Sequence, residues 1–304
     1  MSNAIQLESL ESVKTSVQHT SSYSRSFVFA ALRSIGNGLR AHSSVSTTLA
    51  GLFTVVILIA SLLPSVVTRK DPYATDPVHM FQAPSAEHWF GTDQLGRDLF
   101  ARTVYGAHAT VTASLLSLAI AVVGGLIIGI ASAYVGGFVD TVLMRSVDVL
   151  LSIPGLLLSI TIVTAIGFGT TPVAVAIGVA SLPGFARTTR AQTLKIKNHA
   201  YVEAAVVSGV SPLRIVFSHI LRNVLGPVSV LAMLEFGAVI MSVATLSFLG
   251  FGAKPPAAEW GSLINDGRNY LITSPWISLI PGFVVVLTVL SATVLANNLK
   301  RGER

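Results

Sequence analysis

The sequence predicts an all-α integral membrane protein with six transmembrane helices. Of its 304 residues, 52% are hydrophobic and only 11% are charged, and the mean hydropathy is +0.70. A soluble domain carries about 25% charged residues, so this chain has too few charges to cover a surface that faces water. Backbone groups inside a bilayer must be satisfied within their own segment, and for an open chain this requires helices.

Six apolar runs can each cross the hydrocarbon core, which needs about 20 residues of helix. They are residues 49–67, 111–135, 149–168, 170–186, 224–251 and 274–298. The fourth run is short and contains Pro183. Only residues near 167–171 separate it from the third run, so we expect a tight helical hairpin there.

The distribution of Lys and Arg predicts that both termini lie inside the cell. With the N-terminus inside, 14 of these residues lie in inside segments and 6 in outside segments, as expected for membrane proteins whose cytoplasmic loops are positive. The predicted order is a polar cytoplasmic tail (1–45), a first transmembrane helix (46–68), an extracytoplasmic segment (69–107), a core with five transmembrane helices (108–298) and a cytoplasmic C-terminus (299–304).

Several classes of function are disfavoured by missing patterns. The chain has no cysteine, which excludes disulfides, thiolate metal sites and a cysteine nucleophile. It has no phosphate-binding loop for ATP and no metalloprotease or serine-hydrolase motif. The net charge of +6 comes from residues between apolar runs, which favours cytoplasmic loops over a nucleic-acid surface. We therefore expect no catalytic residue, no metal and no cofactor in this chain.

The inside loop 187–222 predicts two short helices joined at a corner. Residues 200–205 are small and apolar and favour the first helix. Gly209 can end that helix in the left-handed conformation, and Ser211 and Pro212 suit the cap and first position of the next. Leu213, Val216, Phe217, Ile220 and Leu221 are expected near one face, with Arg214, His219 and Arg222 as the polar residues. Such a pair could dock into a groove of another protein, or lie solvated at the interface.

A resemblance to a known family favours docking. Glu203, Ala204, Ala205 and, after three residues, Gly209 resemble the EAA loop of ABC importer permeases. In that family the loop forms a coupling helix that docks into the ATPase subunit. The resemblance implies coupling roles for Tyr201, Glu203, Ala204, Ala205, Gly209, Ser211, Pro212 and His219. This chain has Arg222 where the family often has proline.

An outer motif at residues 88–102 predicts an amphipathic segment that leads into the second helix. Asp93 with Arg97, and Asp98 with Arg102, have the spacing of acid-to-base pairs on a helix, each contributing about 0.2–0.5 kcal/mol. Gly91, Thr92 and Gly96 accompany them. The motif resembles the signature of the C-type permease in dipeptide, oligopeptide and nickel importers. It could form an outer gate, a docking edge for a solute-binding protein, or a structural collar.

Two further stretches resemble the same permeases. Residues 247–253, followed by Pro255, Pro256, Glu259 and Trp260, resemble the stretch after their fifth helix, and residues 148–154 resemble the entry to their third. The resemblance covers roughly residues 83–296. We expect the paired prolines to stop the helix, and Trp260 to lie at the membrane–water boundary as part of the outer gate or docking edge.

Together these resemblances imply the fold of a type I ABC importer permease in a bacterial inner membrane. They imply a homologous B-type permease, two ATPase subunits that bind ATP and Mg²⁺, an extracytoplasmic solute-binding protein and membrane lipid as partners, with no nucleic acid. Peptides are the expected solutes, with nickel or glutathione as alternatives within the family. The competing hypotheses are a stand-alone secondary transporter or channel, and an intramembrane enzyme.

Two features inside the predicted helices need separate interpretation. Gly125 and Gly129 have the spacing that lets helix backbones approach closely, so we expect them to pack within the subunit or against its partner. Glu235 is the one ionisable residue inside an apolar run. An acid at this depth is costly and is a functional candidate by default; it could face the translocation path, face a partner, or be protonated in a hydrogen bond.

Overall fold

The computed structural model describes residues 43–302, which are helical with connecting loops and contain one isolated β-bridge, between Thr92 and Asp98. The chain divides into two compact units, Met1–Leu49 and Ala50–Arg304. Most of the predicted tail 1–45, and part of the predicted C-terminus 299–304, lie outside the described residues.

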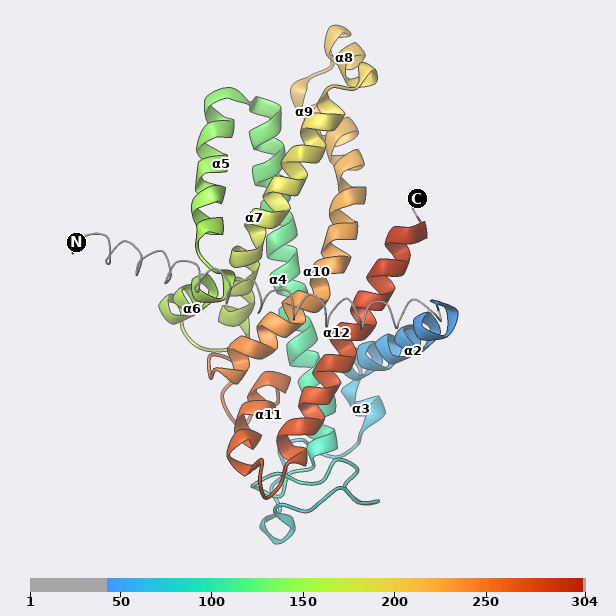
Figure 1. Cartoon of the computed structure of the whole chain (residues 1–304), viewed down its shortest axis with the longest axis vertical. Coiled ribbons are helices and arrows are strands. Elements are labelled where there is room, and N and C mark those ends of the chain that lie inside the picture. Colours follow the sequence, from blue (N-terminus) through green and yellow to red (C-terminus); the bar gives the residue numbers. More distant parts are fainter. Residues whose placement is uncertain (1–42, 303–304) are drawn as a thin grey trace, which may run out of the picture. The chain divides into compact units, whose positions relative to one another are not determined.

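The second unit contains most of the described elements (Figure 1). The chain order is α2 (Ser43–Leu62), α3 (Pro64–Val67), η2 (Pro77–His79), α4 (Leu99–Val135), α5 (Gly137–Ser152), α6 (Gly155–Ile166), α7 (Thr170–Lys197), α8 (Ala200–Val207), α9 (Pro212–Ile215), η3 (Val216–Leu221), α10 (Arg222–Phe248), α11 (Trp260–Gly267), η4 (Arg268–Tyr270) and α12 (Trp276–Gly302).

The prediction of an all-α membrane protein is confirmed, and the helices differ in detail from the six expected runs. Among the described residues, four helical segments are long and apolar enough to cross a membrane, and the bent pair α5 and α6 could supply a fifth. The four are Val45–Leu62, Leu99–Val135, Pro212–Phe248 and Trp276–Asn298. The fourth expected run lies in α7, which continues as one 28-residue helix to Lys197 and gains four basic residues there.

The third expected run is not one straight helix. It is divided between the end of α5 and the whole of α6, whose axes differ by 97°. The division falls at Pro154, which lacks an N–H and also disfavours a helical conformation in the residue before it. Ile153 accordingly has an extended conformation with ψ of 129°. Position 154 therefore converts the expected span into a bent pair.

Helices α4 and α7 pack closely along their length, and glycine makes this approach possible. A Cβ atom on Gly125 would lie 2.4 Å from Phe185 Cβ, and one on Gly129 would lie 2.5 Å from Thr189 Cβ. From α7, Gly178 approaches α4 in the same way. The Ser117 hydroxyl on α4 also donates to the Ala174 carbonyl on α7 at 2.9 Å. The expected close packing therefore lies within this chain.

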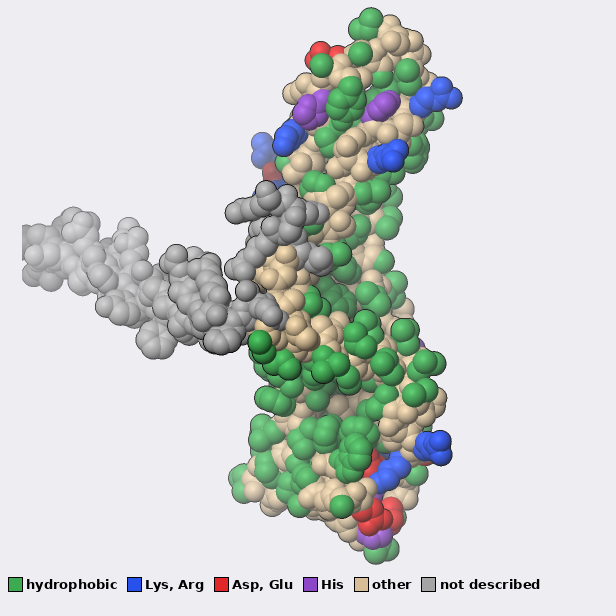
Figure 2. Space-filling model, turned by 90° about the vertical axis from the view of Figure 1, so that its right-hand side faces the viewer, with side chains coloured by type: hydrophobic (Ala, Val, Ile, Leu, Met, Phe, Trp, Pro, Cys, Tyr) green, Lys and Arg blue, Asp and Glu red, His purple; other side chains and the backbone are tan. Residues whose placement is uncertain are grey.

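On the face of the unit Ala50–Arg304 that Figure 2 shows, charged side chains gather at the two ends, with a mostly hydrophobic belt between them. One end carries α8 and α9, and the other carries α11 and the segment before α4 (Figure 1). We call them the α8 end and the α11 end. This distribution is the one expected of a protein whose middle contacts lipid.

The α4–α7 contact makes a testable prediction about stability. Gly129→Ala places a methyl group against Thr189 and the Ala186 carbonyl, so we expect it to lower the free energy of unfolding by about 1–3 kcal/mol. Gly184→Ala on α7 is the matched control, because its added Cβ would have no described atom within 4 Å apart from its neighbours in the same stretch of helix. Thermal denaturation in detergent, followed by size-exclusion chromatography, compares the two. Equal melting temperatures would contradict the packing role of Gly129.

Candidate functional site

The α8 end has a short helix held by a glycine corner, as the sequence predicted. Gly209 follows α8 with φ of +76°. The Gly209 N–H donates to the Val206 carbonyl at 3.0 Å, and the Val210 N–H donates to the Ala205 carbonyl at 3.1 Å. These two bonds form a Schellman motif, which satisfies the last carbonyls of α8. The corner is therefore fixed by backbone hydrogen bonds.

The second helix begins where expected but with a different register. Ser211 and Pro212 occupy the cap and first position of α9, although the Ser211 side chain makes no capping hydrogen bond. The next turn, η3, is π-helical. A π-turn inserts one extra residue, so the buried side chains are Ile215, Ile220 and Val224.

The predicted apolar face of this helix was therefore wrong in part. Leu213 and Phe217 were expected beside Ile220, but they are 72% and 64% exposed. The reason is the π-turn, which rotates them away from the core. The result is a largely exposed apolar surface on this helix.

The predicted coupling residues of the α8 end differ in burial. Tyr201, Glu203 and Ala204 are exposed, while Ala205 and His219 are half-buried. Val202 is buried and anchors α8. Tyr201 stacks on His199 with ring centroids 5.6 Å apart and lies 6.0 Å from the His219 ring. On the same helix as Tyr201, Val207 is 89% exposed.

Ion pairs near the α8 end join α5 to α7, and sequence reasoning missed them. Arg190 donates from Nε and Nη2 to the two carboxylate oxygens of Asp140 at 2.7 and 2.6 Å. Ser132 on α4 donates to the same carboxylate. Lys197 donates to the Tyr134 carbonyl at the end of α4, at 2.9 Å. The available signal was that Asp140 and Arg190 flank the predicted third and fourth runs on the same side of the membrane.

At the α11 end, Asp93 and Arg97 pair as predicted, but they form a turn and not a helix. Arg97 Nε donates to Asp93 Oδ2 at 2.7 Å, and both side chains are buried. Asp93 Oδ1 also accepts from the backbone N–H groups of Leu95 and Arg97. Gly96 has φ of +73°, and a Cβ there would overlap the Asp76 carbonyl. Only glycine fits this turn.

Gly91 and Thr92 occupy a second tight position in the same segment. Gly91 has φ of +77°, and a Cβ there would lie 2.5 Å from the Gln82 carbonyl oxygen. The Thr92 hydroxyl is buried and donates to the His79 carbonyl at 2.5 Å. Trp276 Nε1, at the start of α12, donates to the Thr92 carbonyl at 3.2 Å. The turn is thus attached to the last helix.

The expected Asp98–Arg102 pair is absent. Asp98 caps α4, accepting from the Ala101 N–H at 2.9 Å, and its other oxygen contacts Lys70 at 2.8 Å and the His88 ring at 2.9 Å. Burial by itself would raise the pKa of Asp98, but these hydrogen bonds outweigh it and lower the pKa below its usual value. The reason for the error is that Asp98 lies just before the helix, so its side chain turns back toward the first N–H groups.

Arg102 instead joins three segments in the interior. Its Nη1 donates to the Pro72 carbonyl at 3.1 Å and to the Pro256 carbonyl at 3.3 Å. Its Nε lies 3.4 Å from Asp93 Oδ2, an ion-pair distance without hydrogen-bond geometry. Burial raises the pKa of the nearby Asp266 carboxyl, and the guanidinium groups of Arg102 and Arg97 offset part of that rise.

Glu259 and Trp260 are fully buried, so Trp260 does not lie at the expected membrane–water boundary. Glu259 caps α11 and accepts from Gly261 N–H, Ser262 N–H and the Thr110 hydroxyl, each at 3.1 Å. Trp260 Nε1 donates to the Thr103 carbonyl at 2.9 Å. The indole packs against Gly106, where a Cβ would lie 3.1 Å from its ring. Size and hydrogen bonding therefore place Trp260 in the core.

The predicted site residues at the α11 end therefore form a buried polar network, whereas they were expected to be exposed as a gate or docking edge. The side chains of Thr92, Asp93, Arg97, Asp98, Arg102, Glu259 and Trp260 are all buried. Among the described residues, the exposed apolar side chains of this segment include Val78, Trp89 and Leu95. Any contact of this segment with another protein must use such exposed residues.

Glu235 is exposed on α10, and no hydrogen bond or ion pair of this side chain is present among the described residues. It lies within the apolar segment Pro212–Phe248. Because a carboxylate at this depth is costly in lipid, the surface around Glu235 is a candidate for contact with a polar partner or path.

The chain is similar to transport proteins over most of its length. A sequence profile of the family "Binding-protein-dependent transport system inner membrane component" matches residues 125–304. The dipeptide transport system permease protein DppC of Alkalihalophilus pseudofirmus is 37% identical over 82% of this chain and 82% of its own. The glutathione transport system permease protein GsiD of Pectobacterium atrosepticum is 34% identical over 86% of each chain.

A solved structure of the inward-facing MetNI methionine ABC transporter supports the same fold, with a TM-score of 0.55. It is 18% identical, and the match covers 68% of this chain and 98% of that one. With the profile and the curated relatives, this likeness leads to one conclusion: the chain belongs to the family of binding-protein-dependent transport system inner membrane components.

Proposed function

We propose that this chain is one of two permease subunits of an ATP-driven importer of peptides. The observation that carries the proposal is the exposed α8–α9 surface, held by the Gly209 corner at the end of a continuous α7. The relatives named for dipeptide and glutathione transport support peptide as the solute class. Dipeptides or oligopeptides are the primary assignment, with glutathione or nickel as alternatives.

The proposed assembly contains a homologous B-type permease, two ATPase subunits and an extracytoplasmic solute-binding protein. ATP and Mg²⁺ bind to the ATPase subunits, which dock on the α8–α9 surface inside the cell. Glu203 offers a carboxylate to a basic partner, while Val207, Leu213 and Phe217 offer exposed apolar contacts. A surface of this composition suits a protein groove better than bulk water.

The proposed mechanism is alternating access, with α8 acting as a rigid lever. Only Asn198 and His199 separate α7 from α8. Displacement of α8 by the ATPase subunits would therefore move α7. The Arg190–Asp140 pair and the glycine contacts with α4 support transmission of that movement to α5 and α4.

At the α11 end, the proposed role of the buried network is to brace the outer loops against α4, α11 and α12. Such a brace would keep the exposed side chains of Val78, Trp89 and Leu95 in place for contact with the solute-binding protein. Buried, hydrogen-bonded ion pairs suit this positioning role, because removing one partner leaves a costly unpaired charge.

The docking assignment predicts a specific effect of Glu203→Ala. Removing a carboxylate that is buried against a basic partner costs about 2 kcal/mol or more of binding free energy. We therefore expect about thirtyfold weaker association with the ATPase subunits and loss of uptake. Glu87→Ala is the control, because it removes an exposed carboxylate from the α11 end. Co-purification and vesicle uptake measure both effects. Normal uptake, even after deletion of residues 201–209, would exclude the coupling role.

The proposed topology predicts opposite labelling of two exposed positions. The chain has no cysteine, so Val78→Cys and Val207→Cys each introduce a single thiol, at sites 84% and 89% exposed. A membrane-impermeant maleimide should label position 78 in intact spheroplasts, and position 207 only after the membrane is opened. The buried Asp93 and Arg97 are unsuitable for this test. Labelling of position 207 in intact spheroplasts would contradict the proposed topology and indicate the opposite orientation.

A further inference from the structure

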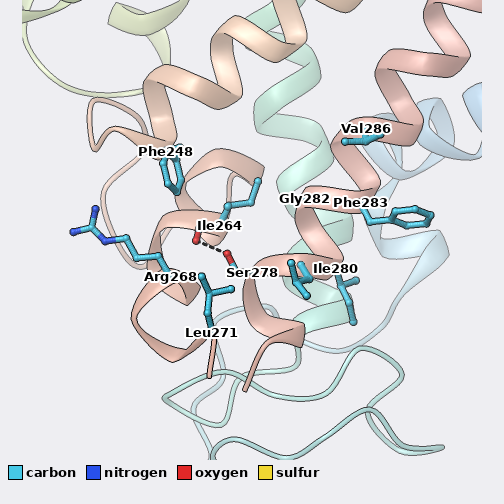
Figure 3. Close-up of a pocket in the computed structure, with 10 residues that line it drawn as sticks. Phe248, Ile264, Arg268, Leu271, Ser278, Ile280, Gly282, Phe283 and Val286 are labelled. Carbon is cyan, nitrogen blue, oxygen red and sulfur yellow. Dashed lines mark hydrogen bonds between the residues drawn. The ribbon is translucent and has the colours of Figure 1, made fainter. Parts of the chain in front are cut away.

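An apolar groove of about 770 Å³ lies between α10, α11 and α12 at the α11 end (Figure 3). Side chains from all three helices and from η4 line it. Those that matter here are Phe248, Ile264, Arg268, Leu279, Phe283 and Val286. Phe283 and Leu279 are each 62% exposed, so the groove is open on the surface of the described chain.

The groove extends from the end of a membrane-spanning helix into its apolar part. Arg268 lies in η4, before the apolar segment Trp276–Asn298 begins. Phe283 and Val286 lie seven and ten residues after Trp276, which at 1.5 Å per residue places them about 10 and 15 Å along the helix. A molecule in this groove would therefore reach from the membrane surface to acyl-chain depth.

Among the described residues that line the groove, Arg268 is the one cation. Figure 3 shows its side chain extending to the edge of the groove, away from Ile264 and Ser278. The described residues form seven ion pairs, and none of them involves Arg268. An arginine in this position can bury its methylene groups along apolar surface while its guanidinium stays at the polar boundary.

We propose that this groove binds a phospholipid with an anionic headgroup, with the phosphate on Arg268 and one acyl chain along Phe283 and Val286. Charge complementarity and the depth of the apolar lining both favour this occupant. Arginine is suited to phosphate because its planar donors match the geometry of the oxygens. The proposal depends on the chain spanning the membrane, and does not depend on the transported solute.

The test uses the whole transporter reconstituted in phosphatidylcholine vesicles, with a small amount of photoreactive lipid. The probe is phosphatidylglycerol or phosphatidylcholine that carries a diazirine in its acyl chain, and mass spectrometry maps the adducts. We expect phosphatidylglycerol to label residues 276–290 about fivefold more than phosphatidylcholine, the factor that one surface cation typically contributes to attraction of an anionic lipid.

Arg268→Gln should abolish this preference, so that both probes label the segment equally. Lys254→Gln is the matched control, because Lys254 is another exposed cation at the α11 end, in the loop between α10 and α11, and does not line the groove. It should leave the preference intact. Arg268 is exposed and outside the described ion pairs, so its variant should assemble normally, which co-purification verifies.

Three outcomes would overturn the proposal. Equal labelling of the segment by the two lipids in the unmodified transporter would remove the headgroup preference. An equal loss of the phosphatidylglycerol preference in Arg268→Gln and Lys254→Gln would show that general surface charge, and not a site at Arg268, causes the preference. The absence of lipid adducts, together with cross-links from Phe283→Cys to the second permease, would show that a protein covers the groove.

Discussion

The close contact between α4 and α7 is the constraint on which the rest of the described structure depends. Without a hydrophobic driving force between helices in lipid, tight association requires backbones that approach closely. Gly125 and Gly129 on α4, and Gly178 on α7, allow that approach, since a methyl group at any of them would overlap the facing helix. The hydrogen bond from Ser117 to Ala174 adds a polar tie between the same helices.

Both candidate functional regions are attached to this pair of helices. At one end α7 leads through two residues into α8, and Lys197 and Arg190 fix the end of α7 to α4 and α5. At the other end, Asp98 caps α4, and Arg102 in its first turn joins the outer loops. A movement of the pair as one body would therefore link the surface proposed for the ATPase subunits to the network proposed as the outer brace.

The sequence predicted the membrane class, the apolar segments and the glycine corner, because each depends on local composition or on one residue's backbone preference. It did not predict where long-range contacts replace local ones. Asp98 and Arg102 have the spacing of a helical pair, yet Asp98 lies before the helix and caps it. Leu213 and Phe217 fit an α-helical face, yet the π-turn at Val216–Leu221 exposes them. Trp260 was expected at the membrane boundary, yet it lies in the core, where Gly106 leaves space for its ring.

The most direct test of this account is whether α4 and α7 remain one rigid body during the transport cycle. Leu116 on α4 and Leu194 on α7 are partly exposed, and the absence of cysteine allows a spin label at each. Pulsed electron spin resonance on the assembled transporter would compare the nucleotide-free and ATP-trapped states, with a label on the second permease to report the overall movement. The account predicts the same distance distribution between Leu116 and Leu194 in both states. A shift in that distance, while the transporter moves, would contradict it.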